Sequence, residues 1–556
     1  MGLARRGARR GVGEDRKSVA RLLGRPDQPS RPWCTDYIRH TCIVPPPSDQ
    51  PSVLQAPVGF NGDYAGAMEK ACGKVRALRE QVSWTDDAPT EVVLTRRCLD
   101  IGRVTYLLRR SGDRIPDDKL REFDSDLRCA IEHSLRGELS EEAWTQTQIG
   151  VKQGGLGLRA ASRSALIAAV SSMLDARPRV HTMCASMSAA GLAPHGVLED
   201  TFDRRLNSAI QQLQGSAPDS VTAELRQQIA TRMLPTSRAE PHDSDGGSPR
   251  GLGSPGRRPG YGLVDGMPQM DDEHPEHRRG REPTQHCLHR IFDAVTAEDL
   301  ANAHAATHRH GHVVRLRELQ HPSVDHTWLW CLGKSRAEAL PEEKYVVAVR
   351  ARLGASQIHD AKVCSFCGKD ALDSECLHAL VCAGPEATKG HTRVKNHLMD
   401  LALQADPAAE SEPQCLASLQ PDARPADVLC SLGGPGQLAA MDVGITTPTP
   451  AHGDVDACEL YKTRKLQKYQ RLFPQLTAQG ITYKPLIWSS WGRSHADAST
   501  VCRHLAAKAA RRRGLADHKD ILADTSAKIG TALQARLADM ITRCIGDDAG
   551  CDVDGT

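Results

Sequence analysis

Four side chains of the types that bind metal ions lie within one short segment of the 556-residue chain. They follow the spacing Cys-x2-Cys-x10-His-x3-Cys and are Cys364, Cys367, His378 and Cys382. Zinc favours thiolate and imidazole ligands, and four protein ligands complete its tetrahedral coordination. A closed site leaves no position for a reacting water, so the spacing predicts a structural zinc knuckle. Cys376 and His391 are alternative ligands, and a set of unpaired thiols is the alternative to a metal site.

Two aspartates follow the predicted knuckle, and each stands among apolar residues. Asp427 lies near the start of the run ADVLC, which follows a proline, and Asp442 lies within LAAMDVGITT. The segment SLGGPGQ between them favours a hairpin turn, so the two runs should be antiparallel neighbouring strands. Their carboxylates would then converge at one end of a sheet. Such carboxylates repel each other unless a cation lies between them, and hard oxygen ligands suit magnesium or manganese.

A lysine-rich helix is predicted after the second of these strands. The segment YKTRKLQKYQRLF contains Lys462, Lys465 and Lys468, and the last two share a helical face. An ammonium group beside two metal-bound carboxylates can orient or deprotonate water and stabilise charge on a phosphate. Glu412, upstream, could add a further ligand. Acid–Asp–Asp–Lys is the set of groups that a metal-dependent phosphodiesterase uses, although aspartates often cap turns and lysine-rich helices are often solvated.

The elements that must position these groups alternate in type. The segment HTRVKNHLMDLALQA has helical spacing, ADVLC and LAAMDVGITT are strand-like, and ITYKPLIWSS is a third strand after the lysine-rich helix. The order helix–strand–strand–helix–strand predicts an α/β domain.

The rest of the chain is predicted to be mainly helical. Apolar residues recur every three or four positions in DKLREFDSDLRCAIEHSLRG and similar segments. Residues 215–281 are rich in Gly, Pro and charge, which predicts a disordered linker. The expected organisation is multidomain, in seven parts: a disordered or truncated N-terminus (1–50), a helical region (51–214), the linker (215–281), a helical connector (282–356), the zinc knuckle (357–395), the α/β domain (396–515), and a C-terminal helix and tail (516–556).

The composition of the chain indicates its cellular compartment and its possible binding partners. The formal net charge is +2, so a nucleic-acid-binding surface would have to be local. The Arg-rich N-terminus has no apolar segment of the secretory type, and no apolar run is long enough to cross a membrane. These features predict a nuclear or cytoplasmic protein without a membrane partner. In a reducing compartment, clustered Cys and His residues indicate metal more often than disulfides.

The order of these motifs resembles the C-terminal part of non-LTR retrotransposon proteins that carry a restriction-like endonuclease. That family has a Cys-Cys-His-Cys knuckle, a helix with Arg and His, an RPADV-type motif, a DV strand and a K-x-x-K-Y helix. The matching positions here are Cys364, Cys367, His378 and Cys382; Arg393, Asn396 and His397; Arg424 to Asp427; Asp442 and Val443; and Lys465, Lys468 and Tyr469. The helical segments before the linker also resemble the region that follows the polymerase palm in the family. The resemblance covers most of residues 51–495 outside the linker.

The resemblance implies a PD-(D/E)XK nuclease fold with Asp427 and Asp442 as the acids that bind magnesium or manganese. In the simplest version of that fold a lysine stands two positions after the second acid, where this chain has Gly444. The lysine is therefore expected from the following helix, as Lys465 or Lys468. The family often has a glutamate where Ser489 and Ser490 stand here.

Polymerase activity is not expected from this chain. A reverse-transcriptase palm needs an aromatic-x-Asp-Asp turn between two apolar strands. The candidate WTDD, Trp84 to Asp87, follows a charged helical segment and so lacks that context.

These features favour two alternative functions, one enzymatic and one limited to nucleic-acid binding. The first is a retroelement-derived, metal-dependent DNA endonuclease that nicks a target site, as a fragment of a reverse-transcriptase-like protein without its palm. The second is a non-catalytic remnant that binds DNA, and possibly element RNA. Its candidate contacts are the basic and aromatic side chains Arg393, Arg424, Arg511, Arg512, Arg513, Trp488 and Trp491.

Overall fold

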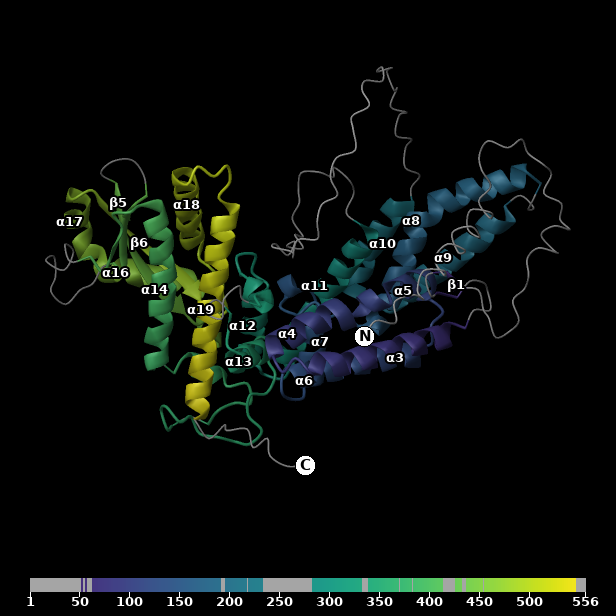
Figure 1. Ribbon diagram of the computed structural model, residues 1–556, viewed down its shortest axis with the longest axis horizontal. Coiled ribbons are helices and arrows are strands. Elements are labelled where there is room, and N and C mark those ends of the chain that lie inside the picture. The colour runs from purple at the N-terminus through teal and green to yellow at the C-terminus, as the bar shows by residue number, and fades with distance from the viewer. Residues whose placement is uncertain are drawn as a thin grey trace, which may run out of the picture.

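The fold was derived from a computed structural model, shown in Figure 1. The structure describes residues 52–53, 56–57, 63–191, 196–217, 219–233, 283–332, 339–369, 371–382, 384–413, 426–432, 437–453 and 455–546. It is mostly helical, with a small mixed sheet towards the C-terminus. In Figure 1 that sheet and its helices occupy one end of the molecule, and helices α3 to α10 occupy the other.

The N-terminal region is helical, as the sequence predicts. A two-stranded antiparallel sheet, β1 (Ser52–Val53) and β2 (Ala56–Pro57), precedes the helices. The α-helices are α3 (Tyr64–Ser83), α4 (Ala88–Leu94), α5 (Thr105–Ser111), α6 (Asp117–Ser134), α7 (Glu141–Gln148), α8 (Ala161–Ala189), α9 (Val197–Gly215) and α10 (Asp219–Met233). Short turns of other helix types connect them: η1 (Thr95–Leu99), η2 (Ile101–Arg103) and η3 (Val151–Gln153).

Side chains from neighbouring helices cap several of these elements. Asp124 of α6 accepts hydrogen bonds from the backbone N–H groups of Ala161 and Ser162 at the start of α8. Such a carboxylate satisfies donors that have no partner inside the helix and also stabilises the helix dipole. The same side chain therefore holds the start of α8 against α6.

The segment WTDD lies in a turn between two helices. Helix α3 ends at Ser83, and the Asp87 carboxylate caps α4 by accepting from the Thr90 N–H at 3.0 Å. Trp84 is 78% exposed. The two aspartates therefore stand in a helix–turn–helix context, which agrees with the expectation that this segment is not a polymerase turn.

Helix α10 corrects the predicted start of the linker. The expected linker began at residue 215, but Asp219–Met233 is helical, and Leu225 and Ile229 are buried on one side of it. These two residues are four apart, so they share a helical face and pack in the cluster formed with α8, α9 and α11. The remainder of the predicted linker lies outside the described residues.

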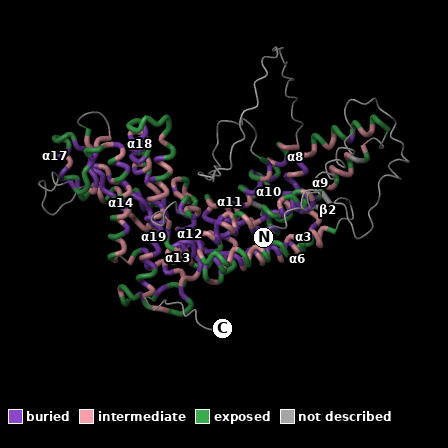
Figure 2. Tube along the Cα trace, in the orientation of Figure 1, coloured by how far each residue is buried: buried purple, intermediate pink, exposed green. Residues whose placement is uncertain are grey.

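The connector contains α11 (Thr284–Ala306), α12 (His310–Leu319), η4 (Thr327–Trp330) and α13 (Glu342–Leu353). Residues of α13 and η4 belong to the same apolar core as α3, α4, α6 and α7. Figure 2 shows buried positions gathered around α12, α13 and the neighbouring part of α19.

The C-terminal region contains a four-stranded sheet between two helical layers. Its elements are η5 (Leu377–Leu380), α14 (Pro385–Ala405), β3 (Glu410–Ser411), β4 (Val428–Ser431), β5 (Leu438–Thr446), η6 (Pro450–His452), α16 (Ala457–Tyr469), η7 (Gln470–Leu472), α17 (Phe473–Ala478), β6 (Ile481–Ser489), α18 (Ala496–Arg512) and α19 (Lys519–Ile545). The strand order is β3-β4-β5-β6. The pairs β3–β4 and β4–β5 are antiparallel, as expected for the second pair, and β5–β6 is parallel.

Side chains on the two faces of the sheet belong to two separate apolar cores. Residues 439, 441 and 443 of β5 face α14, α18 and α19, and Ala440 faces α16, η7 and α17. Because side chains on a strand alternate between faces, Asp442 must point to the side of α16. The order helix–strand–strand–helix–strand predicted from sequence is present as α14, β4, β5, α16 and β6.

Helix α19 joins the parts of the molecule. Leu533 packs in the core beneath the sheet, whereas Leu537 and Ile541 pack in the core shared by the N-terminal helices and the connector. Asp539 binds Lys344 of α13 at 2.5 Å and Arg393 of α14 at 2.8 Å. The sequence predicts a C-terminal helix here, but not its central place in the packing.

Candidate functional site

The four predicted knuckle residues form one cluster. Their ligand atoms all lie within 4.8 Å of one another, with Cys364 buried and the other three half-buried. The Cys364 and Cys382 sulfurs are 3.9 Å apart, and the Cys367 sulfur is 3.5 Å from His378 Nε2. With Zn–S near 2.3 Å and Zn–N near 2.0 Å, ligand atoms at tetrahedral corners are about 3.5–3.8 Å apart. The cluster could therefore hold a metal such as zinc.

Local backbone geometry gathers these ligands. Gly368 has a φ of +65°, and its N–H donates to the Cys364 carbonyl at 2.8 Å, which closes the turn around the first two cysteines. The Cys382 N–H donates to the His378 carbonyl at 3.0 Å, so the last two ligands are one helical turn apart and project together. The chain therefore forms both halves of the cluster from short local turns.

The thiols of the cluster titrate unequally. Burial acts to raise the pKa of Cys364, but the backbone N–H groups of Cys367 and Phe366 outweigh it and lower that pKa to about 7. Burial and contact with the Cys364 thiolate raise the pKa of Cys382 to about 11. A neighbouring thiolate disfavours a second negative charge until a cation is bound.

The two alternative ligands lie outside the cluster. Cys376 is buried nearby, but it is not among the grouped ligand atoms. His391 lies on α14 against the acidic pair, as described below. A further thiol, Cys544 of α19, contacts Cys364, and its carbonyl accepts from the Ser365 N–H at 2.8 Å. Sequence gave no signal for Cys544, because it lies far along the chain from the knuckle.

The two aspartates lie where the β4–β5 ladder ends. Val428 pairs with Met441 in the last pair of the ladder, so Asp427 lies just before β4 and Asp442 follows Met441 on β5. The Asp427 N–H donates to the Met441 carbonyl at 2.8 Å, so Asp427 lies beside Met441, as Val428 does. The Asp442 carboxylate contacts Lys465 of α16, whereas that of Asp427 contacts His391 of α14. The two carboxylates lie near each other at this end of the sheet, where the charge of Asp427 acts on Asp442.

Lys465 and Tyr483 hold the second aspartate from two sides. The Lys465 ammonium donates to Asp442 Oδ1 at 2.6 Å and to the Val443 carbonyl at 2.7 Å. The Tyr483 hydroxyl donates to Asp442 Oδ2 at 2.5 Å. Burial raises the pKa of Asp442, the contacts with Lys465 and Tyr483 oppose that effect, and the Asp427 charge adds to it.

His391 holds the first aspartate. Its Nε2 lies 3.2 Å from Asp427 Oδ2 and 3.2 Å from the Val443 carbonyl oxygen. The Val443 N–H also donates to Asp427 Oδ2, at 2.8 Å. Burial acts to raise the pKa of Asp427, but the His391 contact outweighs it and the net pKa is lowered. The same contact raises the pKa of His391.

The structure distinguishes the two candidate lysines. Lys465 reaches the acidic pair, whereas the Lys468 ammonium lies 4.8 Å from the centre of the Tyr469 ring. A Cβ atom on Gly444 would lie 2.9 Å from Lys465 Cε and 2.7 Å from Tyr461 Cε1. The Lys465 side chain therefore occupies the space beside the strand that a side chain at position 444 would need.

Two further candidate side chains have partners other than the acidic pair. The Glu412 N–H donates to the Asp427 carbonyl at 2.9 Å, but the Glu412 carboxylate binds Lys395 at 2.6 Å. Arg393 pairs with Asp539, so its charge is used between α14 and α19. Arg424 lies outside the described residues.

The C-terminal arginines are exposed away from the acidic pair, and the two tryptophans are buried. Arg511, Arg512 and Arg513 are exposed at the end of α18. Arg512 donates to the Gln404 carbonyl at 3.0 Å, near the end of α14. Since α14 rises about 1.5 Å per residue, this contact lies about 20 Å along the helix from His391. Trp488 and Trp491 are each 3% exposed, so the expectation that they stack on bases is wrong for this fold.

Comparison of the chain with protein-family models gives no match, and no curated protein matches it either. Within the described part of the chain, no helix combines the length and apolarity needed to cross a bilayer.

Proposed function

We propose that the chain is a retroelement-derived, metal-dependent DNA endonuclease of the PD-(D/E)XK type that makes single-strand nicks. The observation that carries the proposal is the convergence of Asp427, Asp442 and Lys465 at one end of the sheet, with Lys465 donating to Asp442 at 2.6 Å. These three side chains come from the residue just before β4, from β5 and from α16, in the order that the sequence resemblance implies.

Oxygen atoms at this site suit a divalent cation. Asp427 Oδ2, Asp442 Oδ1 and the Val443 carbonyl are held in place by the side chains of His391 and Lys465. Carboxylate and carbonyl oxygens are the ligands that magnesium and manganese prefer. A cation bound by these atoms would lower the pKa of a water and neutralise charge on a phosphate.

The side chains have distinct roles in the proposed reaction, which is attack of water on a phosphodiester to leave a 5′-phosphate and a 3′-hydroxyl. Asp427 and Asp442 would hold the cation, and Tyr483 fixes the second carboxylate by donating to its Oδ2. Lys465 carries its charge beside the two acids, where it stabilises negative charge on the phosphate or orients the attacking water. His391 keeps Asp427 facing the site from α14.

We propose that the Cys/His cluster binds a structural zinc ion. Its four ligands leave no open position, and Cys364, Cys376 and Leu380 belong to the core that also contains the connector. The ion would therefore stabilise the connection between the connector and the nuclease domain. It would have no role in the cleavage step.

A plasmid-nicking assay tests the proposed activity. Purified protein is incubated with supercoiled DNA and magnesium or manganese, and the products are examined for relaxed circles. The expected result is metal-dependent nicking with 5′-phosphate and 3′-hydroxyl ends. DNA binding without nicking at any concentration of either metal would favour the non-catalytic nucleic-acid-binding remnant.

A further inference from the structure

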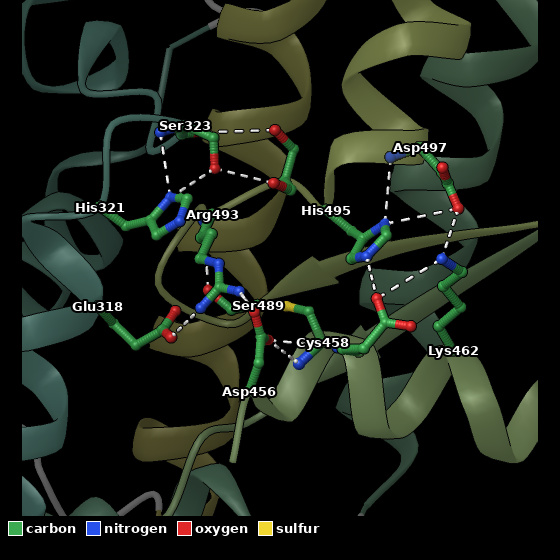
Figure 3. Close-up of polar contacts among 12 residues, drawn as sticks. Glu318, His321, Ser323, Asp456, Cys458, Lys462, Ser489, Arg493, His495 and Asp497 are labelled. Atoms are coloured by element: carbon green, nitrogen blue, oxygen red, sulfur yellow. Dashed lines mark hydrogen bonds and ion pairs between the residues drawn. The ribbon is translucent and has the colours of Figure 1, made fainter. Parts of the chain in front are cut away.

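A polar network joins the connector to the start of the helix that carries Lys465. Figure 3 shows Glu318 and Ser323 of the connector on one side, Asp456 and Cys458 of α16 on the other, and Arg493 between them. Arg493 is 8% exposed and lies in the turn that follows β6. Its position lets one side chain contact two parts of the chain that are far apart in sequence.

The two ends of the Arg493 guanidinium bind different carboxylates. Nη1 donates to Glu318 Oε1 at 2.7 Å, where Glu318 is in the last turn of α12. Nη2 donates to Asp456 Oδ2. The other oxygen of Asp456 caps α16 by accepting from the Cys458 N–H at 2.8 Å and the Glu459 N–H at 3.2 Å.

The backbone of the Arg493 turn is held on the same surface. Val324 forms an antiparallel bridge with Arg493, and the Ser323 hydroxyl donates to the Ser494 carbonyl at 2.8 Å. Within the turn, the Ser489 N–H donates to the Arg493 carbonyl at 2.7 Å. The connector therefore contacts the turn through both backbone and side chains, so the position of Arg493 depends on the connector.

Two more contacts fix the first turns of α16 to the start of α18, which follows the same turn. His495 Nε2 lies 2.7 Å from Glu459 Oε2, and Lys462 binds Asp497 at 2.9 Å. Lys465 is one turn further along α16, where it donates to Asp442 and the Val443 carbonyl. A small rotation at the start of this helix would therefore move the Lys465 ammonium relative to the acidic pair.

We propose that Arg493 is a positioning residue through which docking of the connector sets the place of α16 and of Lys465. The proposal rests on the nuclease function proposed above. The connector would act on cleavage through Glu318, Arg493 and Asp456. This effect is separate from the roles of the acidic pair and of the knuckle. Cleavage should therefore require the docked connector as well as the catalytic side chains.

The test separates this role from simple stabilisation. Arg493→Met leaves the buried Glu318 charge without its partner, which should lower the melting temperature. Adding Glu318→Gln removes that uncompensated charge, so stability should recover. If Arg493 positions α16, the double variant should still nick on the order of 10- to 100-fold more slowly than wild type at saturating DNA, with KM for DNA unchanged.

A matched pair elsewhere provides the control. Arg205 of α9 binds the largely buried carboxylate of Asp113, just after α5, at 2.7 Å, away from α16. Arg205→Met with Asp113→Asn should leave the nicking rate unchanged. Recovery of full nicking together with stability in the Arg493→Met, Glu318→Gln variant would overturn the proposal.

Hydrogen exchange provides a readout that does not depend on activity. Amides in the first two turns of α16 should exchange faster in the double variant than in wild type, and those of α18 should not change. Unchanged exchange in α16 would overturn the positioning role even if wild-type protein proves inactive. Absence of nicking by wild type with altered exchange in the variant would instead contradict only the proposed nuclease function.

Discussion

Among the single residues, the proposed cleavage mechanism depends on which lysine contacts the acidic pair. Lys465→Ala should reduce nicking by at least about 100-fold, because it removes the ammonium group that contacts Asp442. Lys468→Ala, three positions along the same helix, should change the rate less than about threefold. Single-turnover rates of the two variants on one DNA substrate make the comparison. Equal losses in both would mean that the position of Lys465 against Asp442 does not decide catalysis.

His391 and Asp427 should give stability a characteristic pH dependence. The contact raises the pKa of His391 above its ordinary 6.5, so its contribution is lost as pH rises through the folded-state pKa. It lowers the net pKa of Asp427 below 3.8, so that contribution is lost as pH falls through the folded-state value. Between about pH 4 and 6.5 both contributions are present.

The variant His391→Gln isolates this effect. Its deficit in unfolding free energy relative to wild type should be larger at pH 5.5 than at pH 8.5, when urea unfolding is followed without added magnesium. A deficit that is independent of pH across this interval would show that the two side chains do not form an ion pair.

Whether each of these residues could be predicted from the sequence depends on where its partners lie. The two aspartates could be found from sequence because each stands in its own apolar run, and the turn between the runs fixes the antiparallel register. Tyr483 was not predicted and His391 was considered only as a zinc ligand, because their roles depend on β6 and α14 meeting the same end of the sheet. The choice of Lys465 over Lys468 likewise requires the orientation of α16, which spacing alone leaves open.

At the scale of elements, the knuckle should behave as a metal-dependent fold. Cys367→Ser should reduce zinc from one ion per chain to none and should lower the melting temperature, because metal binding is coupled to folding. Zinc content by elemental analysis and melting by circular dichroism provide the two measurements. Cys129→Ser, which alters a half-buried thiol outside the cluster, should keep the zinc. Wild-type protein without bound zinc would contradict the assignment.

Other helices and strands show which secondary structure could not be predicted from the sequence. The order of helices and strands around the acidic pair has clear periodicity and was predicted. Helix α10 was missed because it lies in a polar stretch whose buried face includes only a few apolar residues, such as Leu225 and Ile229. Strand β3 contains two exposed residues, so it has no apolar pattern. Its pairing with β4 is a tertiary interaction that local propensity does not encode.

At the scale of the whole molecule, α19 should make the sheet and the helical core unfold together. Leu537→Ala should destabilise the protein by about 2–5 kcal/mol, because its fully buried side chain lies in the core shared with the connector. Unfolding should be followed with probes in the sheet region and in the N-terminal helices. The two transitions should shift together. A shift confined to one probe would show that α19 does not couple the two cores.

Leu403→Ala is the matched control for that experiment. Leu403 is 43% exposed on α14, so truncation should change stability by no more than about 0.5 kcal/mol. The contrast between the two leucine variants then reports on the position of Leu537 in the core rather than on the loss of a leucine.

If Asp427 and Asp442 form a metal-dependent cleavage site, removing either carboxylate charge should abolish nicking. Nicking of supercoiled DNA is compared among wild type, Asp427→Asn and Asp442→Asn over a range of magnesium or manganese concentrations. Each change removes a charge and preserves shape, so the folded structure and DNA binding should persist. Nicking should fall by at least about 1,000-fold in both variants. Metal-dependent nicking by wild type that survives Asp427→Asn would contradict the account.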